Sequence, residues 1–143
     1  MDEEQLWFDT FNSQATVFEN ARPNFDQLDA DTQTIGALVK LELDMYNGGF
    51  VQFFCNWGHD AYLFAIQGLE KIKAGKAKAI IKEAFEIIDS YEDDARLTKL
   101  WDLPSVLSDD DKTKLDQLDE QYWEDEDQIM ETMLNHFRPL RST

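Results

Sequence analysis

Residues 45–57 read MYNGGFVQFFCNW, and this stretch carries the strongest prediction about the fold. The Asn-Gly-Gly sequence at 47–49 interrupts an apolar helical pattern, because glycine and asparagine adopt positive φ angles more readily than other residues. Four aromatic residues then stand at i, i+3, i+4 and i+7, on one stripe of a helix: Phe50, Phe53, Phe54 and Trp57. We therefore expect one helix to end at Asn-Gly-Gly and a second to bring these rings into a hydrophobic core.

The polar residues of the same stretch are Asn47, Gln52 and Asn56. They could form a binding site, or they could serve as helix caps and as hydrogen-bonding groups inside the core. We favour the second interpretation, because buried polar groups need partners whether or not they have a function.

The composition predicts one globular domain spanning residues 1–143. The chain is 43% hydrophobic and 13% aromatic, which is too apolar for a disordered acidic tail. It has no apolar run of membrane-spanning length and no basic-then-apolar amino terminus. Its one cysteine, Cys55, rules out an internal disulfide and fits a reducing compartment. We expect a cytoplasmic protein.

The charge is unusual, with 13 basic against 30 acidic residues and a formal net charge of −17. Such an excess repels nucleic acids and anionic membranes and attracts basic surfaces. The acids are unevenly spread: residues 108–131 hold eleven acids and two lysines, whereas residues 68–82 hold five lysines and one acid. Any partner is therefore expected to be basic and to bind away from the lysine cluster at 71–82.

Apolar periodicity predicts an all-α bundle of about six to eight helices. No segment alternates with the period of two that a strand requires. The expected helices cover residues 3–20, 29–46, 50–57, 60–72 and 77–90, then a short one near 97–101, and 108–137, which we divide in two because about 30 residues is long for a globular helix.

Helix boundaries can be assigned from capping residues. Asp29, Asp60 and Ser108 are the expected N-caps, and Gly75 stands where a C′ glycine is expected. Gly58 is expected to end the aromatic helix. The helix after it should bury one stripe: Leu63, Phe64, Ile66 and Leu69.

Enzymatic chemistry has little support in the sequence. Cys55 and His59 are four residues apart and form the nearest approach to a nucleophile and base, but Gly58 falls between them. We expect both residues to be structural. The chain has only two histidines and no metal-binding motif, so we expect no cofactor and no metal. A small enzyme that uses carboxylates or the Cys55–His59 pair remains the alternative of a different class.

The acidic carboxyl-terminal region is the candidate partner-binding surface. Helical spacing places acids of this region away from the expected apolar stripe of Leu115, Leu118 and Tyr122. Like charges three or four residues apart destabilise a helix, a cost that solubility alone does not require. The alternative is a solvated acidic face. The candidate residues are Asp109, Asp110, Asp111, Asp116, Asp119, Glu120, Glu124, Asp125, Glu126 and Asp127.

A family resemblance supports the binding interpretation. The run LxLDMYNGGFVQFFCNW at 41–57 resembles the NGGFxQFFxN signature of a family of small acidic bacterial proteins, and LxxLDExY at 115–122 resembles its second block. The similarity spans about residues 28–137. The matching signature residues are Asn47, Gly48, Gly49, Phe50, Gln52, Phe53, Phe54 and Asn56.

The resemblance implies an all-helical fold more firmly than it implies a function. The family is mostly described as of unknown function, but it includes a DNA-mimic protein, which is dimeric and engages a transcription regulator in place of DNA. The expected function is therefore an acidic interaction module that binds and inhibits a basic, nucleic-acid-binding protein, without contacting nucleic acid or membrane and with a homodimer as its implied form. An immunity or inhibitor protein for a basic toxin or nuclease is the alternative within the same class.

Overall fold

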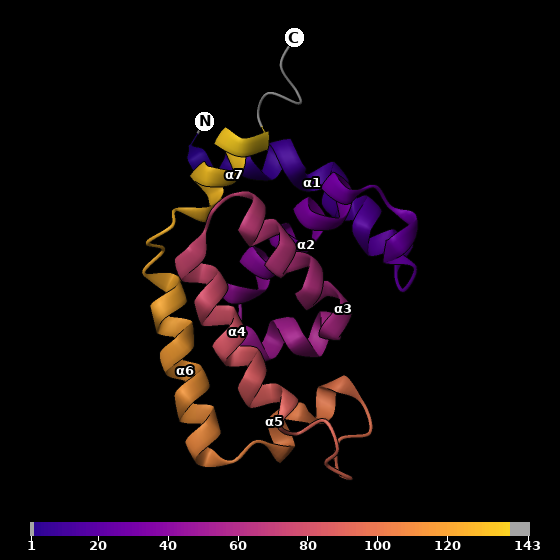
Figure 1. The fold of residues 1–143 in the computed structure, drawn as a ribbon, viewed down its shortest axis with the longest axis vertical. Coiled ribbons are helices and arrows are strands. Elements are labelled where there is room, and N and C mark those ends of the chain that lie inside the picture. Colours follow the sequence, from indigo (N-terminus) through magenta and orange to yellow (C-terminus); the bar gives the residue numbers. More distant parts are fainter. Residues whose placement is uncertain (1, 138–143) are drawn as a thin grey trace.

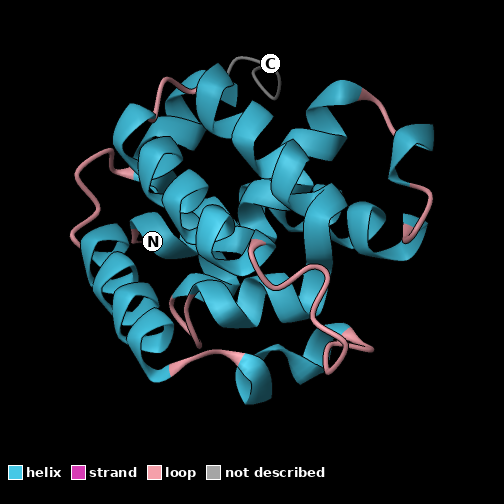
Figure 2. Cartoon of the chain, turned by 60° about the horizontal axis from the view of Figure 1, so that its bottom comes forward, coloured by secondary structure: helices cyan, strands magenta, loops and turns pink. Residues whose placement is uncertain are grey.

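The computed structural model describes residues 2–137, which form helices and loops without any strand (Figures 1 and 2). The predicted all-α fold is confirmed. Seven α-helices and two 3-10 helices (η) follow one another within these residues: α1 (Glu3–Ala21), η1 (Phe25–Gln27), α2 (Ala30–Met45), α3 (Phe50–Lys71), α4 (Gly75–Asp89), η2 (Leu100–Asp102), α5 (Leu103–Val106), α6 (Asp109–Trp123) and α7 (Ile129–Phe137).

Helix α2 lies at the centre of the bundle and packs against both α1 and α3. The inner face of this helix is fully buried and consists of Ile35, Leu38, Leu41 and Met45. Asp29 caps its amino terminus, as predicted, by accepting a hydrogen bond from the Thr32 N–H at 2.7 Å. Around this helix the other elements form a shell, in which α4 and α6 lie side by side and α7 crosses α1 (Figure 1).

The turn between α2 and α3 is organised by Asp44. Its backbone carbonyl accepts hydrogen bonds from the N–H groups of Asn47, Gly48 and Gly49, at 3.2, 2.8 and 2.9 Å. The side-chain amides of Gln52 and Asn56, one and two turns into α3, donate to its carboxylate at 3.2 and 3.3 Å. Gln52 and Asn56 thus make hydrogen bonds within the fold, which is the kind of role expected for them.

The aromatic stripe of α3 enters the core as expected, with Phe50, Phe53 and Phe54 buried and Trp57 partly buried. Gly58 has φ 75, but it kinks α3 instead of ending it. The buried stripe predicted beyond the kink is confirmed at Leu69 and wrong at Leu63, and Phe64 and Ile66 are partly buried against the core. Leu63 is exposed, and the core is reached by Ala61, Tyr62, Ala65 and Leu69. The prediction selected the large apolar side chains of this segment, whereas the small side chains of Ala61 and Ala65 are the ones that face the core.

The end of α3 also differs from expectation. Lys73, with φ 62, occupies the C′ position, and Gly75 is the first residue of α4. The Ala74 N–H donates to the Leu69 carbonyl at 2.8 Å and the Lys73 N–H to the Glu70 carbonyl at 3.1 Å, the paired bonds of a Schellman motif. The motif places Lys73, and not a glycine, in the left-handed region. The expectation that Gly75 occupies the C′ position was therefore wrong.

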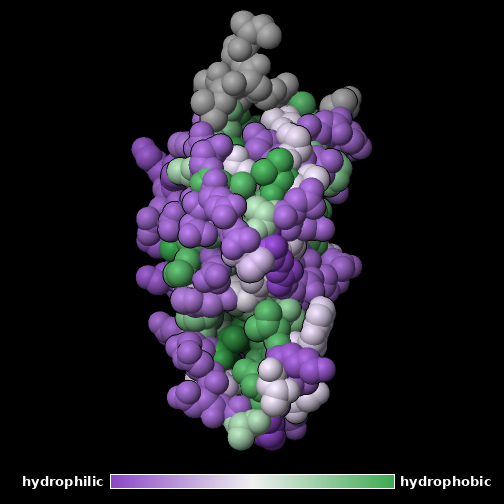
Figure 3. Space-filling model, turned by 90° about the vertical axis from the view of Figure 1, so that its right-hand side faces the viewer, coloured by the Kyte–Doolittle hydropathy of each residue, from purple (hydrophilic) through white to green (hydrophobic). Residues whose placement is uncertain are grey.

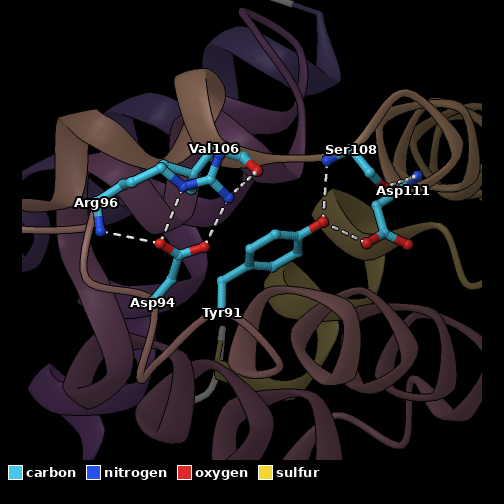
Figure 4. A network of polar contacts seen from close by, with 6 residues as sticks. All are labelled: Tyr91, Asp94, Arg96, Val106, Ser108 and Asp111. Atoms are coloured by element: carbon cyan, nitrogen blue, oxygen red, sulfur yellow. Dashed lines mark hydrogen bonds and ion pairs between the residues drawn. The ribbon is translucent and has the colours of Figure 1, made fainter.

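A network of polar contacts ties the long α4–α6 connection to the start of α6 (Figure 4). The Tyr91 hydroxyl donates to the Asp111 carboxylate at 2.5 Å and accepts from the Ser108 N–H at 2.9 Å. Beside it, Arg96 pairs with Asp94 at 2.8 Å. These contacts fix where α6 begins and therefore how its acidic surface is oriented.

Candidate partner-binding surface

The prediction that residues 108–137 form two helices is confirmed, and α6 is the acidic one. Ser108 caps it by accepting a hydrogen bond from the Asp111 N–H at 3.1 Å. The acids of the first turn lie at the positive end of the helix dipole, which favours helix formation. Leu115, Leu118 and Tyr122 face the core, as predicted.

Six of the ten candidate acids are exposed to solvent: Asp109, Asp110, Asp116, Glu120, Glu124 and Glu126. Asp116, Glu120 and Glu124 follow one another at intervals of four residues, so they form a row along one side of α6 and its end. Lys112 bounds this row one turn earlier. Glu126 forms an ion pair with Lys76 of α4, at 3.3 Å. Figure 3 shows the opposite side of the molecule, away from α6, where polar side chains surround several apolar patches.

Asp119 does not belong to this exposed set, and its predicted position was wrong. It is only 7% exposed and accepts a hydrogen bond from the Phe50 N–H at 2.9 Å, which caps the amino terminus of α3. Burial raises the pKa of its carboxyl to about 6, and the bond from Phe50 opposes the shift. The sequence places Asp119 next to Leu118 and one turn after Leu115, so the edge of the apolar stripe was the available signal.

Three further candidates are half-buried and serve as caps or anchors. Asp111 accepts from Tyr91, as described above. Asp125 accepts a hydrogen bond from the Ile129 N–H at 3.1 Å, at the start of α7. Asp127 accepts one from the Ala77 N–H at 2.7 Å, in the first turn of α4. Their carboxylates are committed to the fold, so they are less available to a partner than the exposed six.

Glu42 on α2 is a functional candidate that the sequence analysis missed. It is 1% exposed, and burial, together with the nearby negative charge of Asp125, raises the pKa of its carboxyl to about 8. Its Oε2 atom and the Tyr122 hydroxyl are both buried without a hydrogen-bond partner within the described residues. Glu42 stands four residues after Leu38 and seven after Ile35, so its place on the apolar stripe was the signal.

Glu42 lines a surface groove of about 680 Å³, which we call the Glu42 groove. The groove is formed by three parts of the chain: the first half of α1 with the residue before it, the end of α2 with the residues after it, and the α6–α7 region. The lining consists of Asp2, Glu4, Gln5, Trp7, Phe8, Glu42, Leu43, Tyr46, Asn47, Asp125 and Met130.

Cys55 and His59 are placed on opposite sides of the Gly58 kink. The Cys55 thiol donates to the Leu100 carbonyl at 3.3 Å, and burial raises the pKa of this thiol. The exposed His59 ring packs near Phe85, with ring centroids 5.2 Å apart. Within residues 2–137, no hydrogen bond joins the two side chains, and no group of three or more histidine, cysteine or acidic side chains is arranged to hold a metal ion.

The fold and the surface together define a small all-helical acidic protein with a carboxylate-lined exposed face. The chain belongs to the DMP19-like protein family, whose family model matches residues 5–142. No curated protein and no solved structure matched the chain. Among the helices of residues 2–137, none combines the length and the apolar character that a membrane span requires.

Proposed function

We propose that this protein is a DNA mimic, whose exposed carboxylates on α6 and just after it bind and inhibit a basic, nucleic-acid-binding protein such as a transcription regulator. It acts by binding and not by catalysis, in the cytoplasm and without a cofactor. The observation that carries the proposal is the exposed row of Asp116, Glu120 and Glu124. The homodimer implied by the sequence resemblance stays a prediction.

The row presents repeated negative charge, which is the property of DNA that electrostatic imitation would reproduce. Residues four apart on a helix lie about 5–6 Å from one another, and like charges at that spacing repel. Duplex DNA presents repeated charge of the same sign, about one per 1.7 Å of its axis. A protein that binds phosphates through lysine and arginine can therefore bind a row of carboxylates with the same side chains.

Family membership supports the proposal independently of the charge count. The family that the sequence resembles includes a DNA-mimic protein, and the DMP19-like family model covers nearly the whole chain. The arrangement of Cys55 and His59 gives no support to the enzymatic alternative, because the kink at Gly58 separates them.

The test is a pull-down from the source cell, followed by competition. The captured partner should be a DNA- or RNA-binding protein, duplex DNA should displace it, and its retention should fall steeply with salt, since surface charges are screened beyond about 10 Å at 0.1 M. The triple variant D116K/E120K/E124K should lose at least about tenfold in affinity, because three attractive contacts become repulsive.

The matched control is D26K/E83K/E92K, which makes the same change in net charge at exposed acids outside α6. It should retain most of the affinity. Equal losses in both triples would show that net charge alone drives binding. A partner that holds DNA and this protein at the same time would contradict mimicry.

A further inference from the structure

The Glu42 groove contains a buried carboxyl group that the proposed function does not use. Glu42 lines the groove, and its Oε2 atom is buried; neither this atom nor the neighbouring Tyr122 hydroxyl makes a hydrogen bond of ordinary geometry within the described residues. Most buried polar groups in folded proteins are hydrogen-bonded, and an unsatisfied one costs stability. A ligand that brings hydrogen-bond donors into the groove would remove that cost.

The walls of the groove combine negative charge with exposed aromatic surface. Asp2, Glu4 and Asp125 supply the carboxylates, and the described residues that line it include no lysine or arginine. Phe8 and Tyr46 are 37% and 51% exposed, so both rings present apolar surface to the groove. Acidic and aromatic walls together are complementary to a cation with a flat face.

We propose that the Glu42 groove binds the guanidinium group of an arginine side chain from a basic protein partner, with the Glu42 carboxylate as acceptor. A guanidinium carries five N–H donors in one plane and stacks on aromatic rings, whereas the compact lysine ammonium does neither as well. The proposal deepens the proposed function, because the basic partner supplies the arginine. The groove also adjoins the acidic region through Asp125.

Binding should be linked to proton release. In the empty groove, desolvation and the charge of Asp125 keep Glu42 largely protonated at neutral pH, with its pKa at about 8. An arriving guanidinium favours the ionised carboxylate, so the Glu42 proton leaves to solvent as the ion pair forms. The other titratable groups around it are Asp2 and Glu4 at the start of α1, Tyr46 at the end of α2, Tyr122 on α6 and Asp125 after α6.

The experiment measures binding of the peptide acetyl-Gly-Arg-Gly-amide by calorimetry, with the citrulline peptide as its neutral isostere. The arginine peptide should bind at least about tenfold more tightly, because citrulline keeps the shape and loses the charge. The variant E42Q should lose about tenfold or more, and affinity for the wild type should rise by up to about tenfold per pH unit between about pH 6 and pH 8.

Two more variants complete the design. Y46L removes an exposed ring and leaves Glu42 unchanged, and it should weaken binding by several-fold. This variant tests the site even if E42Q proves unstable. E83Q removes an exposed glutamate outside the groove and should bind like the wild type.

Several results would overturn the arginine site: no binding of the arginine peptide, equal binding of the citrulline peptide, or unchanged binding in E42Q and Y46L. A loss in E83Q as large as in E42Q would show unspecific attraction and also overturn it. Failure of mimicry is separate, because it is measured with the whole partner, duplex DNA and the α6 triple variant.

Discussion

Asp119 and Glu120 are neighbours in sequence and carry the same formal charge, yet they belong to different parts of the molecule. Glu120 lies in the exposed row of α6 with Asp116 and Glu124. Asp119 is buried and caps α3, and Glu42 on α2 is more deeply buried still. The net charge of −17 therefore combines two kinds of acid. Exposed acids affect recognition, whereas buried acids affect stability and its dependence on pH.

The largest expected effect concerns the turn that meets Asp119. Gly49 has φ 85, and a Cβ there would lie 2.2 Å from the Asp119 Oδ2 atom. G49V should therefore lower the free energy of unfolding by about 3 kcal/mol or more, since it combines backbone strain with displacement of a buried cap. Denaturant unfolding measures the loss.

Gly48 provides the matched control for this turn. A Cβ at Gly48 would lie 2.0 Å from the Gln52 Oε1 atom and 3.0 Å from the Gln52 Cβ atom, so the Gln52 side chain must move, but the backbone at Gly48 does not require a positive φ. G48V should cost clearly less than G49V. If the two variants lose equal stability, the steric conflict with Asp119 is not what restricts the turn.

The next effect is the pH dependence of the free energy of unfolding near neutral pH, for which we expect Glu42 to be the main cause. Its pKa is about 8 in the folded protein against 4.5 for an unperturbed glutamate. Between these values the unfolded chain has released the proton and the folded protein still holds it, so stability falls as pH rises. From about pH 6 to pH 8 the free energy of unfolding should fall by roughly 2 kcal/mol.

The variant E42Q separates this contribution from the repulsion of the other acids. The glutamine side chain is neutral at every pH. The difference in free energy of unfolding between wild type and E42Q should therefore change between about pH 6 and pH 8. Asp119, with a pKa of about 6, contributes the same sign mainly at lower pH. Parallel stability curves for the two proteins would mean that Glu42 titrates normally.

The smallest effects are expected when Asp119 and Glu120 are each replaced by alanine. D119A should destabilise by roughly 1–2 kcal/mol, because it leaves the buried Phe50 N–H without its acceptor. E120A should change stability by less than about 0.5 kcal/mol, because exposed charges contribute little. Thermal unfolding of both variants tests the comparison, and similar melting temperatures would contradict it.

Local sequence signals predicted most of the fold. The periodic apolar residues of α2, the cap residues Asp29 and Ser108, and the Asn-Gly-Gly break each act within a few residues, so they can be interpreted without the rest of the chain. The errors have two different causes. In the second half of α3 the small residues Ala61 and Ala65 face the core while the larger Leu63 is exposed, and at the end of α3 a Schellman motif places Lys73 where a glycine was expected.

The candidate surface divides in the same way. The sequence by itself determined that the acids concentrate in residues 108–131 and that α6 presents one apolar side. Only the tertiary structure decided that Asp119 faces the α3 terminus, that Asp125 and Asp127 cap other helices, and that Glu42 lies buried beside a groove. The physical reason is that helical spacing fixes the direction of a side chain, whereas its solvation depends on which distant element packs over it.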